Sequence, residues 1–197
     1  MRGLPDPAVV RPRGSVIIDR QTRRDLSRDL LSESLANGRA VTLNTDGLSM
    51  GRTIRRTDRI VVEGADPERL APGDLILYRT AHGLVAHRVI RLPRAGGDPR
   101  LQTMGDGHLA PDEPIAHAQI IGRVTAIIAG KRRITLHGGT ACCAARAQAA
   151  YSRALARIAA VCRGRIPHPI LDVLRPLLRL PTHTLAALWR LTAARRY

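Results

Sequence analysis

Aromatic side chains are scarce in this sequence: they make up 2% of the 197 residues, and Phe is absent. A hydrophobic core therefore has to be built from Leu, Ile, Val and Ala, within a hydrophobic content of 44%. The length suits one domain with a sizeable core, or one domain plus an appendage. Because few rings are available to stack on bases, the composition argues against single-stranded nucleic acid as a partner.

Long apolar runs are also missing. No stretch of about 18 apolar residues occurs, so no transmembrane helix is expected. Met1–Arg39 contains no apolar segment of the kind found in signal peptides, so none is expected there. These two absences predict a cytoplasmic protein, at most peripheral to a membrane.

Cysteine is rare. Cys142, Cys143 and Cys162 lie among small apolar residues and form no Cys-x-x-Cys pair, which argues against a zinc site. We expect all three to be small helix-packing residues in a reducing compartment.

Acidic residues are few, and they are unevenly distributed along the chain. The chain has 32 basic and 16 acidic residues, a net charge of +16. Residues 131–197 hold 13 basic residues and one acid, net +12, whereas residues 1–130 hold 19 and 15, net +4. A cationic tail could dock on an anionic membrane surface or on another phosphate-bearing partner. A solvated arginine-rich face is the simpler alternative.

Residues 1–38 are predicted to form an arm and a helix. A strand is expected at Val16–Ile18, and a capping box at Thr22–Asp25 predicts a helix that runs to Ala36. Asn37-Gly38 should end this helix with a left-handed glycine. Its apolar face is predicted to consist of Leu26, Leu30, Leu31 and Leu35.

Residues 39–137 read as a β-rich domain of short strands separated by Gly and Pro turns. Strands are predicted at 39–43, 59–62, 75–79, 84–91, 101–104, 118–129 and 132–136, with Gly122 as a bulge or bend. Residues 138–197 then become helical and basic. The first helix is expected to pack through Tyr151, Leu155, Ile158 and Cys162, and a last helix is predicted at Thr182–Arg195.

Three residues on separate segments are suited to nucleophilic catalysis. Ser49 lies in a Gly-flanked loop, His87 in an apolar strand, and Asp112 in a turn. A serine hydroxyl needs a base to accept its proton, and a neutral imidazole oriented by a carboxylate is such a base. We therefore predict Ser49 as nucleophile, His87 as general base and Asp112 as the residue that orients it.

Five short motifs also occur in a fixed order: Ser49–Ile54, Gly73–Ile76, His87–Val89, Gly105–Asp106 followed by Asp112, and Gly122–Val124. Over residues 39–136 this order resembles the signal peptidase I-like serine peptidases, in the branch that uses histidine where bacterial enzymes use lysine. The self-cleaving repressors share the related peptidase fold. With the N-terminal helix and the basic helical C-terminal tail predicted above, we expect an α+β fold with a β-rich, mixed-sheet core, which the resemblance implies to be barrel-like and peptidase-like.

The resemblance supports the same catalytic residues, with Asp106 as a rival for the role of Asp112. It implies cleavage of a leader or precursor peptide after a small residue, through an acyl-enzyme, with no cofactor. The predicted substrate-binding residues flank the serine and are Gly47, Leu48 and Met50. The family usually has Pro and Gly at the positions of Arg52 and Thr57. No pair of histidines has the spacing of a metal motif, so no metal is assigned.

Two other hypotheses remain. One is a binding module that keeps the fold, holds a peptide and does not cleave it. The other is a nucleic-acid-binding regulator like the self-cleaving repressors, which the net charge favours. The N-terminal region offers one helix rather than a helix-turn-helix, and no Ala-Gly pair precedes Ser49, so the sequence argues against the regulator.

Overall fold

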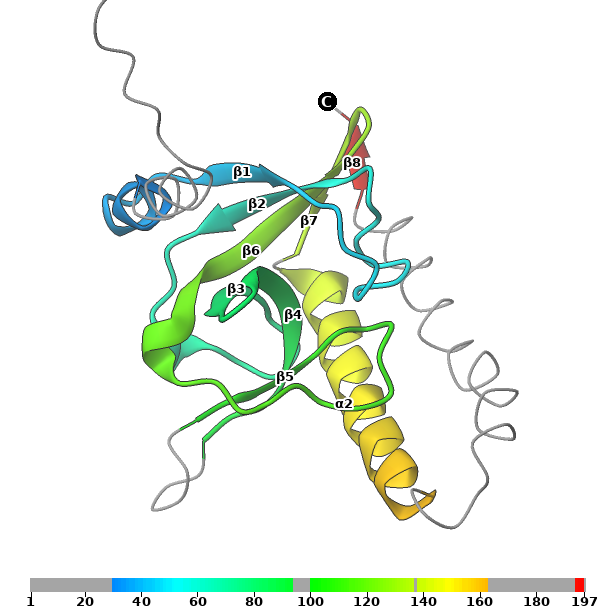
Figure 1. The fold of residues 1–197 in the computed structure, drawn as a ribbon. Helices are drawn as coiled ribbons and strands as arrows, with labels where there is room; N and C mark the ends of the chain where they lie inside the picture. Colours follow the sequence, from blue (N-terminus) through cyan, green and yellow to red (C-terminus); the bar gives the residue numbers. More distant parts are fainter. Residues whose placement is uncertain (1–29, 94–99, 137, 163–193, 197) are drawn as a thin grey trace, which may run out of the picture.

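The structure is a computed structural model that describes residues 30–93, 100–136, 138–162 and 194–196. The predicted strand at Val16–Ile18, the start of the first helix and most of the basic tail lie outside these residues. The described chain forms one β-sheet, with the end of the first helix beside β1 and a long helix, α2, beside β4 (Figure 1).

The sheet has eight strands, and every pair is antiparallel. They are β1 (Val41–Asn44), β2 (Arg59–Glu63), β3 (Leu75–Thr80), β4 (Gly83–Arg91), β5 (Gln102–Met104), β6 (Ile120–Ala129), β7 (Arg132–Thr135) and β8 (Ala194–Arg196). Short 3-10 turns, η1 (Pro67–Arg69) and η2 (His117–Gln119), precede β3 and β6. The α+β class is confirmed. The mixed and barrel-like features are wrong for the described residues, because the order β1-β2-β6-β3-β4-β5 stays open between its two ends.

β6 is the strand on which the sheet is built. One of its edges pairs with β2, while the other pairs first with β3 and then with β7. The register of β6 against β3 shifts between Leu77 and Tyr78, next to Gly122, where a bulge or bend was predicted. A Cβ at Gly122 would collide with the carbonyl oxygen of Glu63, so only glycine lets β2 approach this closely.

β3 separates two aliphatic cores, as the period of two residues in a strand requires. Leu75 and Leu77 face a larger core shared with β2, β6 and β7. Ile76 and Tyr78 face a smaller one that includes Val89 and Leu101. Tyr78, His87 and their neighbours therefore occupy the face opposite that of Leu77.

The first helix ends as predicted. Gly38 has φ +71°, its amide donates to Leu35 O at 3.1 Å, and the amide of Arg39 donates to Ser34 O at 3.0 Å. This is the Schellman arrangement, which satisfies the last carbonyl groups of a helix. Leu31 and Leu35 are buried, but Leu30 is 63% exposed, so its predicted place on the apolar face is wrong.

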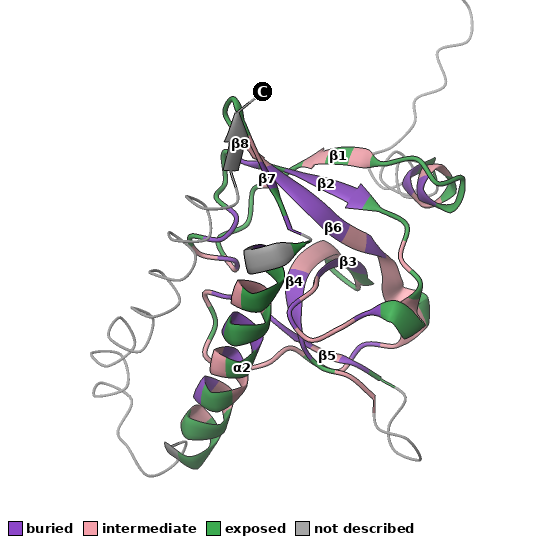
Figure 2. Cartoon of the chain, turned by 180° about the vertical axis from the view of Figure 1, so that it is seen from behind, coloured by how far each residue is buried: buried purple, intermediate pink, exposed green. Residues whose placement is uncertain are grey.

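α2 (Gly139–Cys162) packs beside β4 and the turn before β3. A Cβ at Gly73, which has φ +110°, would come within 2.9 Å of the Ala145 backbone, so glycine allows this close contact. The buried side of the helix is visible in Figure 2 and consists of Ala141, Gln148, Ala149, Ser152 and Leu155. Of the predicted face, Leu155 is buried, Tyr151 is half-buried, and Ile158 is 50% exposed. The placement of Ile158 was wrong.

Two further expectations about residues 138–197 need correction. Cys142 and Cys143 are exposed rather than packed, because they lie on the outer side of α2. The predicted last helix is wrong at residues 194–195, since Ala194–Arg196 pair as β8 with β7. The side chain of Cys162 and the rest of that helix lie outside the description. The division into 1–38, 39–137 and 138–197 stays a prediction.

Candidate functional site

His87 and Asp112 form a hydrogen-bonded pair. His87 lies in β4, and Asp112 lies in the turn after β5, held there by its amide, which donates to Thr103 O at 2.9 Å. The Nδ1 of His87 is 2.6 Å from Oδ2 of Asp112, and their side chains are 5% and 19% exposed. The structure therefore joins these two sequence-predicted residues through the ring nitrogen that an orienting carboxylate would hold.

Two hydroxyl groups support the Asp112 carboxylate. Thr103 Oγ1 donates to Oδ2 at 2.7 Å, and the Tyr78 hydroxyl donates to the same oxygen at 3.2 Å. Desolvation, the largest single effect, raises the pKa of Asp112. The hydrogen bond and charge of His87 and the two hydroxyl groups together outweigh it, so the pKa falls below its ordinary value of 3.8.

This ionised acceptor fixes the tautomer of His87. Nδ1 donates to Asp112, so a neutral ring keeps its lone pair on Nε2. Nε2 is buried, and no group in the described part of the chain hydrogen-bonds to it. A buried lone pair without a partner costs free energy. The arrangement therefore leaves a basic nitrogen ready for a proton or another electrophile.

The Ser49 loop lies against the turn that faces this nitrogen. The amide of Gly107 donates to Ser49 O at 2.7 Å. A Cβ built on Gly105 would lie 2.6 Å from the backbone oxygen of Ser49 and 3.0 Å from His87 Nε2, so the Ser49 carbonyl group and the His87 ring both lie beside Gly105. Because Nε2 has no partner among the described residues, the Ser49 hydroxyl is not hydrogen-bonded to it in this structure.

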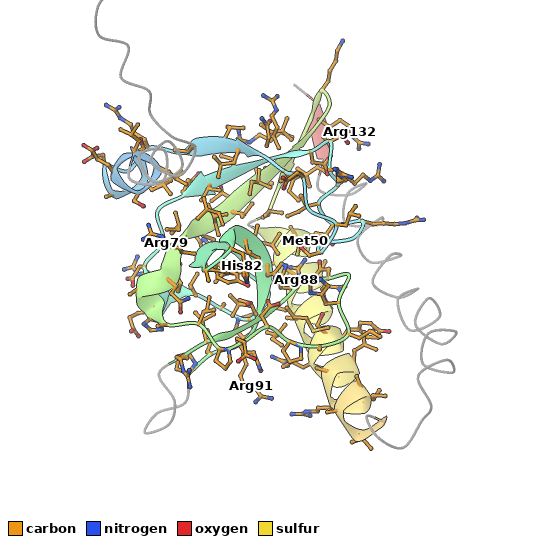
Figure 3. All side chains as sticks on the ribbon, viewed as in Figure 1. Met50, Arg79, His82, Arg88, Arg91 and Arg132 are labelled. Carbon is orange, nitrogen blue, oxygen red and sulfur yellow. The ribbon has the colours of Figure 1, made fainter. Side chains whose placement is uncertain are left out.

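Asp106 has a different setting from Asp112. Its carboxylate accepts two hydrogen bonds from Arg88, at 2.9 and 2.7 Å, and one from Thr53 Oγ1 at 2.6 Å. Arg88 also donates to Gly73 O at 2.8 Å. Figure 3 shows Arg88 inside the molecule, in contrast to Arg132 at the tip of the β6–β7 hairpin. Asp106 thus ties the Ser49 loop to β4, whereas Asp112 contacts His87.

A groove of about 350 Å³ opens beside Ser49. In the described chain, β1 pairs only with β2, and Gly83–Ala86 of β4 pair only with β3, so both strands leave an edge open. The groove is lined by Leu43, Asn44, Thr45, Asp46, Gly47, Ser49, Met50, Ile54, Ile60, Leu77, Leu84, Val85 and Ala86. Its floor is mostly aliphatic, and its rim carries strand backbone.

The predicted substrate-binding residues differ in position. Gly47 lines the groove and is exposed. Met50 also lines it, but its side chain is 4% exposed and belongs to the larger core. Leu48 is 72% exposed and is not among the lining residues. Gly47 and Met50 can therefore shape the groove, while Leu48 presents an apolar side chain to solvent next to Ser49.

His108 joins the site from the turn after Gly105. Its ring meets that of His87 edge to face, with 5.3 Å between centroids. His87, His108 and Asp112 each have a metal-ligating atom within 4.8 Å of one another. Sequence spacing did not show this group, because His87 comes from a distant strand.

Tyr78 and Thr103 are two further site residues that sequence reasoning missed. In the β3–β4 register Ile76 lies opposite His87, so Tyr78, two residues further on, shares the face of His87. Thr103 lies opposite Val89 and points to that face as well. A polar residue in each apolar strand was the available signal, but it becomes informative only once the register is known.

No protein-family model matches the sequence, and the searches of curated proteins and of solved structures found no match. The likeness to signal peptidase I-like enzymes thus stands on its five motifs.

Proposed function

We propose that this chain is a serine endopeptidase of the signal peptidase I-like kind, which cleaves a leader or precursor peptide. Ser49 is the nucleophile, His87 the general base and Asp112 the residue that orients the base. The observation that carries this proposal is the part-buried His87–Asp112 pair, in which Nδ1 is held at 2.6 Å and Nε2 keeps a lone pair beside the Ser49 loop.

The proposed reaction has two steps. Ser49 Oγ attacks the scissile carbonyl carbon while its proton passes to His87 Nε2, and the tetrahedral intermediate then expels the amine, which takes that proton. Water attacks the resulting ester, gives a proton to Nε2, and the proton returns to Ser49 Oγ as the acid leaves. Asp112 stabilises the imidazolium in both steps, as its lowered pKa allows.

The groove supports an extended peptide as the substrate. A peptide lying between β1 and Gly83–Ala86 could hydrogen-bond to two open strand edges, which provide affinity without sequence preference. The aliphatic floor formed by Ile54, Leu77 and Ala86 would then select small or apolar side chains. Such a peptide would pass Ser49 at the end of the groove.

A second candidate is a peptide-binding module without catalysis. One observation favours it: the Ser49 hydroxyl makes no hydrogen bond to His87 Nε2. Catalytic hydrogen bonds are often long in a structure without substrate and tighten only when substrate binds, so we place the peptidase first.

A defined library of synthetic peptides, analysed by mass spectrometry, tests the two candidates. The peptidase predicts new termini that cluster after small residues with the wild-type chain and disappear with Ser49→Ala. Ser34→Ala, in the first helix, is the matched control and should cleave like the wild type. Cleavage that persists fully in Ser49→Ala would refute the mechanism. Binding of library peptides without any cleavage would favour the module.

The cellular location of the protein is part of the same proposal. The helices in the described residues include none that is long and apolar enough to cross a bilayer. We propose a cytoplasmic enzyme that docks on anionic membranes through residues 138–197, since α2 carries three arginines and no acid. Co-sedimentation with phosphatidylglycerol vesicles, lost at high salt and absent with phosphatidylcholine, is the expected result.

A further inference from the structure

We propose that His87 and His108 form a binding site for a divalent transition metal ion such as Zn²⁺, and that the bound ion inactivates His87. Imidazole nitrogen is a preferred ligand of Zn²⁺ in proteins. Binding of the metal needs only the geometry of this cluster. Its effect on catalysis rests on the proposed peptidase function.

His87 is already arranged as a metal ligand. The residue is 4% exposed, and its Nδ1 is held by a carboxylate at 2.6 Å. A carboxylate on one ring nitrogen orients the other toward a metal and raises its basicity. Nε2 is that other nitrogen, and it has no hydrogen-bond partner among the described residues.

Gly105 lies beside the ring nitrogens of both histidines. The position that a Cβ on Gly105 would occupy lies 3.0 Å from His87 Nε2, 3.1 Å from His108 Nδ1 and 2.6 Å from Ser49 O. The two ring nitrogens thus lie on the same side of Gly105, and ligating atoms of His87 and His108 come within 4.8 Å of each other. Imidazole nitrogen is a donor type that suits Zn²⁺.

His108 provides both the second ligand and the entrance. Its side chain is exposed and meets the buried ring of His87 edge to face. Zn–N bonds are about 2.0–2.1 Å long, so the rings of His108 and His87 have to approach a common point when the ion binds. With two protein nitrogens rather than the four ligands of a structural site, the binding should be reversible.

Metal binding and catalysis would compete for one lone pair. The electron pair on Nε2 can accept the Ser49 proton or bind the metal, but not both. Under the proposed function Zn²⁺ is therefore an inhibitor whose effect depends on His108, a residue that the acyl-transfer steps do not use.

Calorimetric titration of the full chain with ZnCl₂ tests the site. The exposed thiols of Cys142 and Cys143 can also bind zinc, so every protein carries Cys142→Ser and Cys143→Ser. In that background His108→Ala should weaken the tightest site by about tenfold or more. His108→Cys should retain binding, because it supplies another zinc ligand. His82→Ala, in the exposed β3–β4 turn, is the matched control and should bind like the parent.

Equal zinc affinity in the parent and His108→Ala would overturn the inference. Peptide cleavage is then measured with and without Zn²⁺. Zinc binding that requires His108 in a chain without cleavage would uphold the metal site and refute the peptidase. Cleavage that zinc inhibits equally in the parent and in His108→Ala would uphold the peptidase and refute the metal site.

Discussion

Arg88 and Asp106 form a bidentate buried ion pair, in which Nε and Nη2 of Arg88 lie 2.9 and 2.7 Å from the two carboxylate oxygens of Asp106. Their side chains are 6% and 3% exposed. The pair also binds Thr53, which follows Ser49 in its loop, and Gly73, in the turn before β3. This one contact therefore holds the Ser49 loop, β4 and the Gly73 turn in a fixed relation.

Asp106→Asn should destabilise the protein strongly. The change leaves the Arg88 guanidinium buried without its counter-charge, which typically costs about 3–5 kcal/mol. The free energy of unfolding, measured by urea denaturation, should fall by about this amount. Asp66→Asn is the matched control, because Asp66 pairs with Arg69 at an exposed site and its change should stay within about 1 kcal/mol. Equal effects of the two variants would contradict this role for Asp106.

Gly105→Ala should separate the Ser49 loop from His87. The added methyl group would lie 2.6 Å from Ser49 O, so the loop has to move. We expect a loss of about 1–3 kcal/mol in the free energy of unfolding, together with a loss of peptide cleavage. Gly47→Ala is the stability control, because its nearest neighbour would be Ser49 Oγ at 3.9 Å, an ordinary contact. If Gly105→Ala cleaved peptide at the wild-type rate, the Ser49 loop would not need to lie this close to His87.

The strands were predictable because their signals are local. Alternation and β-branched residues located β2, β3, β4 and β6, and the turn at Gly130 lies between the predicted strands 118–129 and 132–136. The pair His87–Asp112 could also be expected, but only through the motif order, since the two residues are 25 positions apart. Local pattern alone does not bring such residues together.

What could not be predicted depends on long-range packing. Which face of α2 is buried is decided by Gly73 and β4, not by the helix, so Ile158 and the two exposed cysteines were misplaced. Tyr78 and Thr103 reach Asp112 only through the β3–β4–β5 register. The strand at residues 194–196 needs β7 as its partner, which is distant in sequence.

The lowered pKa of Asp112 predicts a pH-dependent stability. Because the folded-state pKa lies below the ordinary 3.8, the carboxylate stabilises the fold above that pH and loses this contribution as the pH falls through the folded-state pKa. Unfolding free energies of the wild type and Asp112→Asn, measured from about pH 7 to about pH 3, should therefore converge at the acid end. A difference in unfolding free energy between the two proteins that stayed constant over this pH range would contradict the lowered pKa of Asp112.

Tyr78→Phe should weaken the support of Asp112 without breaking the site. The variant loses one hydroxyl donor at 3.2 Å, while Thr103 still donates at 2.7 Å. A hydrogen bond of this kind is worth about 0.5–1.5 kcal/mol, so cleavage should slow by about twofold to tenfold. Tyr151→Phe, on α2 and away from the site, serves as the control. Unchanged cleavage by Tyr78→Phe would show that the Tyr78 hydroxyl does not help Asp112 to orient His87.

The central claim is that His87 activates Ser49, and covalent labelling of the serine tests it most directly. The full chain is incubated with a serine-reactive fluorophosphonate, and the adduct is located by peptide mass spectrometry. The account predicts one adduct, on Ser49, that is lost in His87→Gln, a variant whose side chain cannot act as a base. An unlabelled Ser49 in the folded wild type, or labelling that His87→Gln leaves unchanged, would contradict it.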